Sequence, residues 1–224
     1  MLTENSNAMD TLIAGYAAGA LPTPLHALVE AHLEMSPVNR SYAADLEVLR
    51  AAELDDVNPA KMMGRDAFLE QLFHPDHQIN TASSCHCNNT EASLAQAEPT
   101  LPRSLARYLN LDLTDIPWKS RLMGVREHKV GEIDGCNVSM FWLKAGTGVP
   151  THTHGGAEVT LVLHGGYSDG LGHYVRGDLA YADDSVDHRP VADDDGDCIG
   201  IAVTDAPLKL TGPVGRILNP LLRF

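Results

Sequence analysis

The spacing of apolar residues in the first third of the chain is that of helices. Over residues 10–18 the apolar side chains share one helical face, and Gly19 follows as a stop. Thr23-Pro24 is a typical helix start, with Thr23 as the N-cap and Pro24 in the first turn. The helix that it opens is predicted to run to about Met35.

Two further helices are predicted before this periodicity ends. Ser36-Pro37 repeats the combination of a capping residue and a proline, and the apolar residues after it keep helical spacing. A short fourth helix is expected over about residues 65–73. These segments together predict a small helical domain over residues 1–73.

Residues 74–102 show no periodicity and are mostly polar, which indicates a linker. The segment contains His74, His77, Cys85 and Cys87, and two imidazoles with two thiolates could bind zinc. The Cys-x-Cys spacing is shorter than that of most zinc sites, so the role of these residues is left open.

After about Asp112 the pattern changes to short strands that are separated by Gly-rich and Asp-rich turns at regular intervals. Such spacing is typical of an antiparallel sandwich or barrel, which is predicted over residues 103–224. The strand candidates are 138–143, 159–163, 173–175, 178–182 and 198–203.

Composition and charge narrow the class of protein. Of the 224 residues, 44% are hydrophobic and 21% are charged, as in an ordinary globular protein. The net charge of −14 argues against nucleic acid as a direct partner, because phosphate binding needs clustered Lys and Arg. An acidic chain could instead bind a protein with a basic surface. No signal peptide or membrane helix is recognised, and the isolated cysteines suit a reducing compartment, so a cytoplasmic location is expected.

The candidate chemistry lies in the segment His152-Thr-His154-Gly-Gly-Ala-Glu158, followed thirty residues later by His188. On a strand, His152 and His154 point to the same face, and the Gly-Gly bend can fold Glu158 back beside them. Three imidazoles and one carboxylate form a complete ligand set for one divalent transition metal. Zinc is the first expectation, and manganese, iron, nickel and copper accept the same ligands; a metal-free hydrogen-bonded cluster is the alternative.

The spacing Gly-x5-His-x-His-x3-Glu-x6-Gly over residues 146–165 resembles the first motif of the cupin barrels. The second motif is partly present, because Gly177 is followed at cupin spacing by His188. The resemblance implies a small jelly-roll barrel that holds the four candidate ligands around one metal. The Pro, Gly and Asn usual in the second motif are replaced by Asp183, Ser185 and Ala192.

A helical domain followed by a cupin resembles the ChrR-type anti-sigma factors. The resemblance implies an α+β chain of two domains, in which the helical bundle binds an extracytoplasmic-function sigma factor and the cupin senses oxidative stress such as singlet oxygen. The likeness is carried by residues 16–19, 29–33, 158–163, 188–192, 197–199 and 204–208.

The helical half departs from the family at its zinc site. The family holds zinc through an early His and a His-x3-Cys-x2-Cys motif; here His32 is kept, but Ser36 and Asn39 stand at the two Cys positions and Asn7 at the early His. Ser and Asn bind zinc poorly compared with thiolate, so no zinc is expected in the helical domain.

Three functions remain open at this point. The first is a regulator that sequesters a sigma factor without catalysis. The second is a metal-dependent cupin enzyme such as a dioxygenase, for which Tyr167, Tyr174 and Tyr181 could serve as acid or base, although packing roles are expected for them. The third is a diverged relative that binds another partner, and a homodimer is also left open.

Overall fold

The computed structural model describes residues 2–73 and 100–211. The chain divides into two compact units, one of residues 1–50 with 99–224 and the other of residues 51–98. The linker residues His74, His77, Cys85 and Cys87 lie outside the described part of the chain. The domain boundaries expected from the sequence, 1–73, 74–102 and 103–224, stay a prediction.

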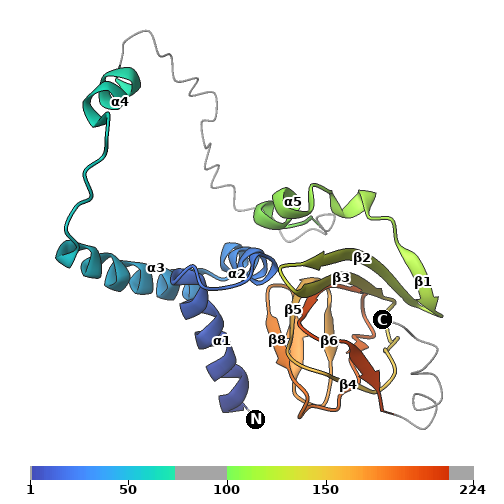
Figure 1. The fold of residues 1–224 in the computed structure, drawn as a ribbon. Coiled ribbons are helices and arrows are strands. Elements are labelled where there is room, and N and C mark those ends of the chain that lie inside the picture. Colours follow the sequence, from blue (N-terminus) through green and yellow to red (C-terminus); the bar gives the residue numbers. More distant parts are fainter. Residues whose placement is uncertain (1, 74–99, 212–224) are drawn as a thin grey trace. The chain divides into compact units, whose positions relative to one another are not determined.

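Three helices open the first unit, in the order predicted (Figure 1). They are α1 (Leu2–Ala17), α2 (Thr23–Met35) and α3 (Pro37–Ala52). The first begins earlier than predicted, whereas α2 ends at Met35 as predicted and begins one residue early, at Thr23. Ser36 caps α3 weakly, because the N–H of Asn39 donates to Ser36 Oγ at 3.5 Å.

The prediction that Thr23 caps α2 is wrong. Pro22 occupies the cap position, and the N–H and hydroxyl of Thr23 both donate to Oδ2 of Asp134. Asp134 and Gly135 form the turn between β2 (Val125–Ile133) and β3 (Cys136–Leu143), and both have a positive φ, as a two-residue hairpin turn requires. A carboxylate from the barrel therefore caps the helix, which the local sequence of α2 could not indicate.

The second unit contains a 3₁₀ turn, η1 (Glu53–Asp56), and the short helix α4 (Arg65–Leu72), which matches the predicted fourth helix. Several large apolar side chains of the second unit are exposed, among them Met63 at 97% and Phe73 at 80%. Among the described residues, no helix is long and apolar enough to cross a membrane.

The second half of the first unit is an antiparallel jelly-roll barrel, as the cupin resemblance implies. All five predicted strands are present. The sequence does not predict α5 (Arg103–Leu109), β1 (Lys119–Leu122), β2, β6 (Gly166–Ser168), β9 (Val191–Ala192) or β11 (Leu208–Leu210). The largest sheet has the order β1 (Lys119–Leu122), β2, β3, β10 (Cys198–Thr204), β5 (Glu158–His164) and β8 (Leu179–Ala182). Two smaller sheets pair β11 (Leu208–Leu210) with β4 (His152–His154), and β7 (His173–Val175) with β6 (Gly166–Ser168) and β9 (Val191–Ala192).

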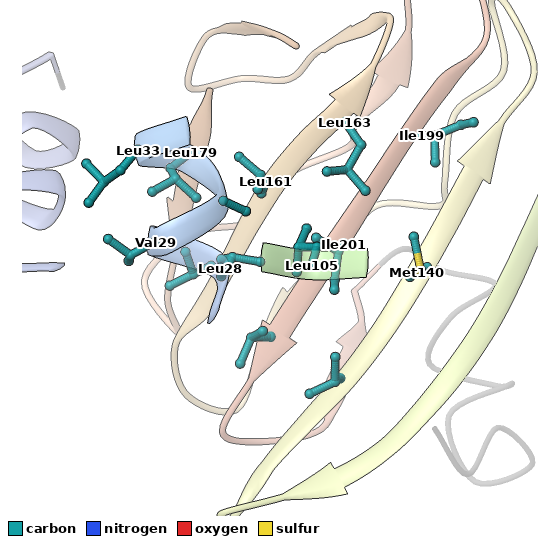
Figure 2. Close-up of a cluster of buried hydrophobic side chains, with 14 of the residues drawn as sticks. Leu28, Val29, Leu33, Leu105, Met140, Leu161, Leu163, Leu179, Ile199 and Ile201 are labelled. Carbon is teal, nitrogen blue, oxygen red and sulfur yellow. The ribbon is translucent and has the colours of Figure 1, made fainter. Parts of the chain in front are cut away.

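At β5 and β10 both faces of the largest sheet are buried, which explains why most residues of these two strands are apolar. Leu161 and Ile201 face α2 and α5 (Arg103–Leu109), as Figure 2 shows. Val162 and Cys198, which have the opposite parity, belong to a second cluster inside the barrel. The helices and the barrel of this unit therefore share one hydrophobic core.

Candidate metal centre

The three candidate histidines are brought together by backbone pairing. His152 and His154 are the ends of β4, which pairs with β11. His188 lies between β8 and β9 and is tied to His152 by two backbone hydrogen bonds, each with an N···O distance of 3.0 Å. The positions of the three Cα atoms are thus set by main-chain bonds rather than by the side chains themselves.

The three rings meet at their Nε2 atoms. Nε2 of His188 lies 3.0 Å from Nε2 of His154 and 3.1 Å from Nε2 of His152. All three side chains are buried, and one ligand atom of each lies within 4.8 Å of the others. Two nitrogens that bind one ion at about 2.0 to 2.1 Å are themselves about 3 Å apart, so the separations suit a shared metal.

The hydrogen-bond partners of the outer nitrogens indicate that Nε2 of His152 and of His188 carries a free lone pair. Nδ1 of His152 lies 2.9 Å from the carbonyl of Pro150, and Nδ1 of His188 lies 2.8 Å from a carboxylate oxygen of Asp169. Both partners only accept, so each Nδ1 carries the hydrogen, and in the neutral rings neither Nε2 does. Two lone pairs that face each other at 3.1 Å fit a cation between them.

Burial keeps two of these rings in the form that binds metal. It lowers the pKa of His152 to about 4, with the neighbouring His188 as a smaller cause. It also lowers the pKa of His154 to about 4, where His152 and His188 add to the effect. Both imidazoles are therefore neutral at pH 7, as metal ligation requires.

Glu158, the fourth predicted ligand, lies beside His154 rather than at the point where the three Nε2 atoms meet. It begins β5 and has the parity of the strand face inside the barrel. One carboxylate oxygen lies 3.5 Å from Nδ1 of His154, and the other accepts a hydrogen bond from Thr160 at 3.2 Å. Burial raises the pKa of Glu158. Nδ1 of His154, the ring nitrogen that does not meet the other two histidines, is buried without a hydrogen-bond partner. The place of Glu158 among the ligands stays a prediction.

Asp169 is a residue of this site that the sequence did not indicate. It lies in the turn after β6, where Asp169-Gly170 had suggested only a turn, and its side chain is 2% exposed. Burial raises the pKa of its carboxyl, but the hydrogen bonds from His188, Leu171 and Gly172 outweigh burial and lower it below its usual value.

In the helical segment, the family's zinc position is occupied by hydrogen bonds. His32 is buried; its Nδ1–H donates to the carbonyl of Gly177 at 2.6 Å, and the side-chain amide of Asn39 donates to its Nε2 at 2.7 Å. Asn7 lies on α1 with its side chain exposed. Both ring nitrogens of His32 are therefore satisfied without an ion, and the absence of zinc stays a prediction.

The remaining candidates are packing residues. Tyr167 and Tyr174 are buried with their ring centroids 5.2 Å apart, as expected for core tyrosines. Cys198 is fully buried, and burial raises the pKa of its thiol to about 12, so it behaves as a small hydrophobic residue. Tyr181 is half-buried against the shared core.

A jelly-roll barrel with a buried three-histidine cluster defines a cupin. The family model described as the ChrR cupin-like domain matches residues 107–206. The anti-sigma-E factor ChrR of Cereibacter sphaeroides is 29% identical over 223 residues, covering 100% of both chains. The crystal structure of Rhodobacter sphaeroides SigE in complex with the anti-sigma ChrR is similar with a TM-score of 0.71 at 30% identity, covering 88% of this chain and 96% of that chain. The chain belongs to the ChrR-type family of anti-sigma factors.

Proposed function

We propose that this chain is an anti-sigma factor that binds an extracytoplasmic-function sigma factor through its helical segments and keeps it from RNA polymerase. The observation that carries the proposal is the likeness to ChrR over both the helices and the barrel, in a relative whose solved structure contains a sigma factor. Sequestration needs no catalysis, and the buried tyrosines of the barrel suit packing rather than proton transfer.

Exposed apolar side chains support a protein partner. On α3, Val38, Val48 and Leu49 are between 68% and 79% exposed. In the second unit, a helix of eight residues gains little stability on its own, and its neighbourhood exposes further large apolar side chains. Large apolar side chains that are exposed in the free chain are candidates for contact with a protein partner. Those of the second unit are Leu54, Val57, Met62, Met63, Phe68 and Phe73.

The test is binding of the purified full chain to extracytoplasmic-function sigma factors from the same organism, measured by calorimetry. Met63→Asp should weaken binding, because a carboxylate replaces an apolar contact that is 97% exposed in the free chain. Met123→Asp is the matched control, since Met123 is 96% exposed in the β1–β2 turn of the barrel. Absence of a complex at micromolar concentration, or equal effects of the two substitutions, would contradict the proposal.

We further propose that His152, His154 and His188 hold one divalent transition metal, with Glu158 as the fourth ligand. Zinc is the first expectation for this metal. The neutral rings of His152 and His154 and the facing Nε2 lone pairs of His152 and His188 support this assignment. Bound zinc would be coordinated by both segments and would therefore cross-link the strand of His152 and His154 to the segment of His188. The chain's own residues hold the three rings in place before any ion binds.

We propose that the barrel is the part that responds to oxidative stress such as singlet oxygen. The contact between His32 of α2 and Gly177 of the barrel supports a direct route from the barrel to the helices of the same unit. The test is to illuminate the sigma complex with a singlet-oxygen-generating dye and to measure release of the sigma factor. Release that is equal in the wild type and in His152→Ala would contradict a sensing role for the cluster.

A further inference from the structure

One buried carboxylate contacts the histidine cluster from outside the predicted ligand set. Asp169 Oδ2 lies 2.8 Å from Nδ1 of His188, the ring nitrogen that faces away from the other two histidines. The Asp169 side chain is 2% exposed and that of His188 is 4% exposed, so water does not compete strongly for this bond.

The carboxylate is held in place by its own turn. Its Oδ1 accepts the backbone N–H of Leu171 at 2.8 Å and that of Gly172 at 3.1 Å. The N–H of Asp169 donates in turn to the carbonyl of Gly172 at 2.9 Å. With one oxygen fixed by two backbone donors, the other oxygen is directed at His188 and has little freedom to rotate.

The sheet places this turn beside His188. Strand β6, which ends one residue before Asp169, pairs with β9, and Ser168 lies opposite Val191. His188 is three residues before Val191 on that same segment. The β6–β7 hairpin and the His188 segment are therefore joined by main-chain bonds, and the contact between the two side chains follows from that pairing.

We propose that Asp169 is a positioning residue of the cupin metal centre, which holds His188 in the Nδ1–H tautomer so that its Nε2 lone pair faces the ion. An ionised carboxylate only accepts hydrogen bonds, so it selects the ring form with hydrogen on Nδ1. Carboxylates that hold a ligating histidine in this way commonly set the tautomer and orientation of the ring. The inference rests on the proposed metal site.

Glu158 and Asp187 do not perform this task. Glu158 contacts His154, at 3.5 Å from its Nδ1. Asp187 precedes His188 in the sequence, but its side chain accepts a hydrogen bond from the Thr211 hydroxyl at 2.6 Å and the residue is exposed. Among the described residues, the carboxylate hydrogen-bonded to His188 is that of Asp169.

The test compares Asp169→Asn with Asp187→Asn, which removes the same charge beside the site without removing the bond to His188. Zinc affinity is measured by competition with a chelator, and the tautomer of His188 by the ¹⁵N chemical shifts of its ring in metal-free protein. Asp169→Asn should weaken zinc binding by about 10-fold to 100-fold and shift His188 toward the Nε2–H form, because an amide can donate to Nδ1. Asp187→Asn should leave the tautomer unchanged.

The two readouts separate the inference from the metal proposal. If the wild type binds no zinc, the metal proposal fails, and the tautomer of His188 in the metal-free chain still tests Asp169. Finding His188 of the wild type in the Nε2–H form would overturn the inference. This measurement needs no variant, so the role of Asp169 can be tested even if Asp169→Asn does not fold. An unchanged tautomer and zinc affinity in Asp169→Asn would overturn it as well.

Discussion

The side-chain amide of Asn39 donates to Nε2 of His32 at 2.7 Å, at a position where the family's motif places a zinc-binding cysteine. The other ring nitrogen of His32 donates to Gly177 in the barrel. A hydrogen bond between neutral groups therefore occupies the ring nitrogen that a metal could otherwise use. The same histidine joins α2 to α3 on one side and to the barrel on the other.

Asn39→Ala should destabilise the first unit. The substitution leaves the buried Nε2 of His32 without a donor, and an unsatisfied buried acceptor costs about 1 to 3 kcal/mol. Urea unfolding followed by circular dichroism measures the change in the free energy of unfolding. Ser41→Ala is the control, because Ser41 is exposed on the same helix. A loss no larger than that of Ser41→Ala would show that the hydrogen bond contributes nothing.

The pH dependence of stability should contain a contribution from His32. Burial lowers its pKa, while the hydrogen bond to Gly177 and the charge of Asp178 oppose the shift. The unfolded chain then binds the proton more readily than the folded chain, so this contribution is complete above about pH 6.5, the ordinary pKa of histidine, and is lost as the pH falls below it.

Urea unfolding of the wild type and His32→Gln, each at pH 7.5 and at pH 5.5, measures this contribution. The wild type should lose more stability than the variant on acidification, because only the wild type must protonate a buried ring at position 32. The same loss in both proteins would mean that His32 does not carry the effect.

One equivalent of metal should be present per chain. His152→Ala combined with His154→Ala should abolish metal binding, since it removes two of the three clustered imidazoles. His32→Ala should retain the full equivalent. Elemental analysis of the purified proteins gives the ratio, with a correct fold checked by circular dichroism. Two equivalents in the wild type, one of them lost in His32→Ala, would show that the helical segment binds zinc after all.

Leu161→Ala should destabilise the first unit by about 2 to 5 kcal/mol, because Leu161 is fully buried in the core shared by the barrel and α2. Thermal unfolding should show one transition, at a lower temperature, in which the helical and strand signals change together. Leu122→Ala, at a side chain that is 50% exposed on β1, is the control. Unfolding of the helices apart from the barrel would mean that the shared core is not cooperative.

Much of the fold followed from local pattern. The Thr-Pro start and the helical spacing of apolar residues predict α2, and short apolar runs between Gly-rich and Asp-rich turns predict the five strands. Strand β6 is not predicted because it begins at Gly166, in a Gly-Gly pair that indicates a turn, and β9 is not predicted because it has two residues. Helix α5 was missed because it has seven residues and follows the segment assigned as a linker.

The candidate site was predicted unevenly for the same reason. The spacing of His152 and His154 on one strand and the Gly-Gly bend before Glu158 indicate these three residues, and the cupin resemblance supports adding His188 to them. Asp169 carries no spacing signal, because it reaches His188 only through the pairing of β6 with β9. Whether a single Asp in a turn is a surface residue or a buried hydrogen-bond acceptor depends on what packs over it.

By itself the sequence determined the helical and strand patterns, the candidate imidazoles and the presence of Ser36 and Asn39 where the family's motif has cysteines. The tertiary structure decided which groups form hydrogen bonds with the polar atoms whose partners the local sequence does not supply. Asp134 rather than Thr23 caps α2, Asn39 satisfies His32, and Asp169 orients His188. Hydrogen bonds between residues far apart along the chain depend on distances that only the packed fold sets, so no local window of sequence contains them.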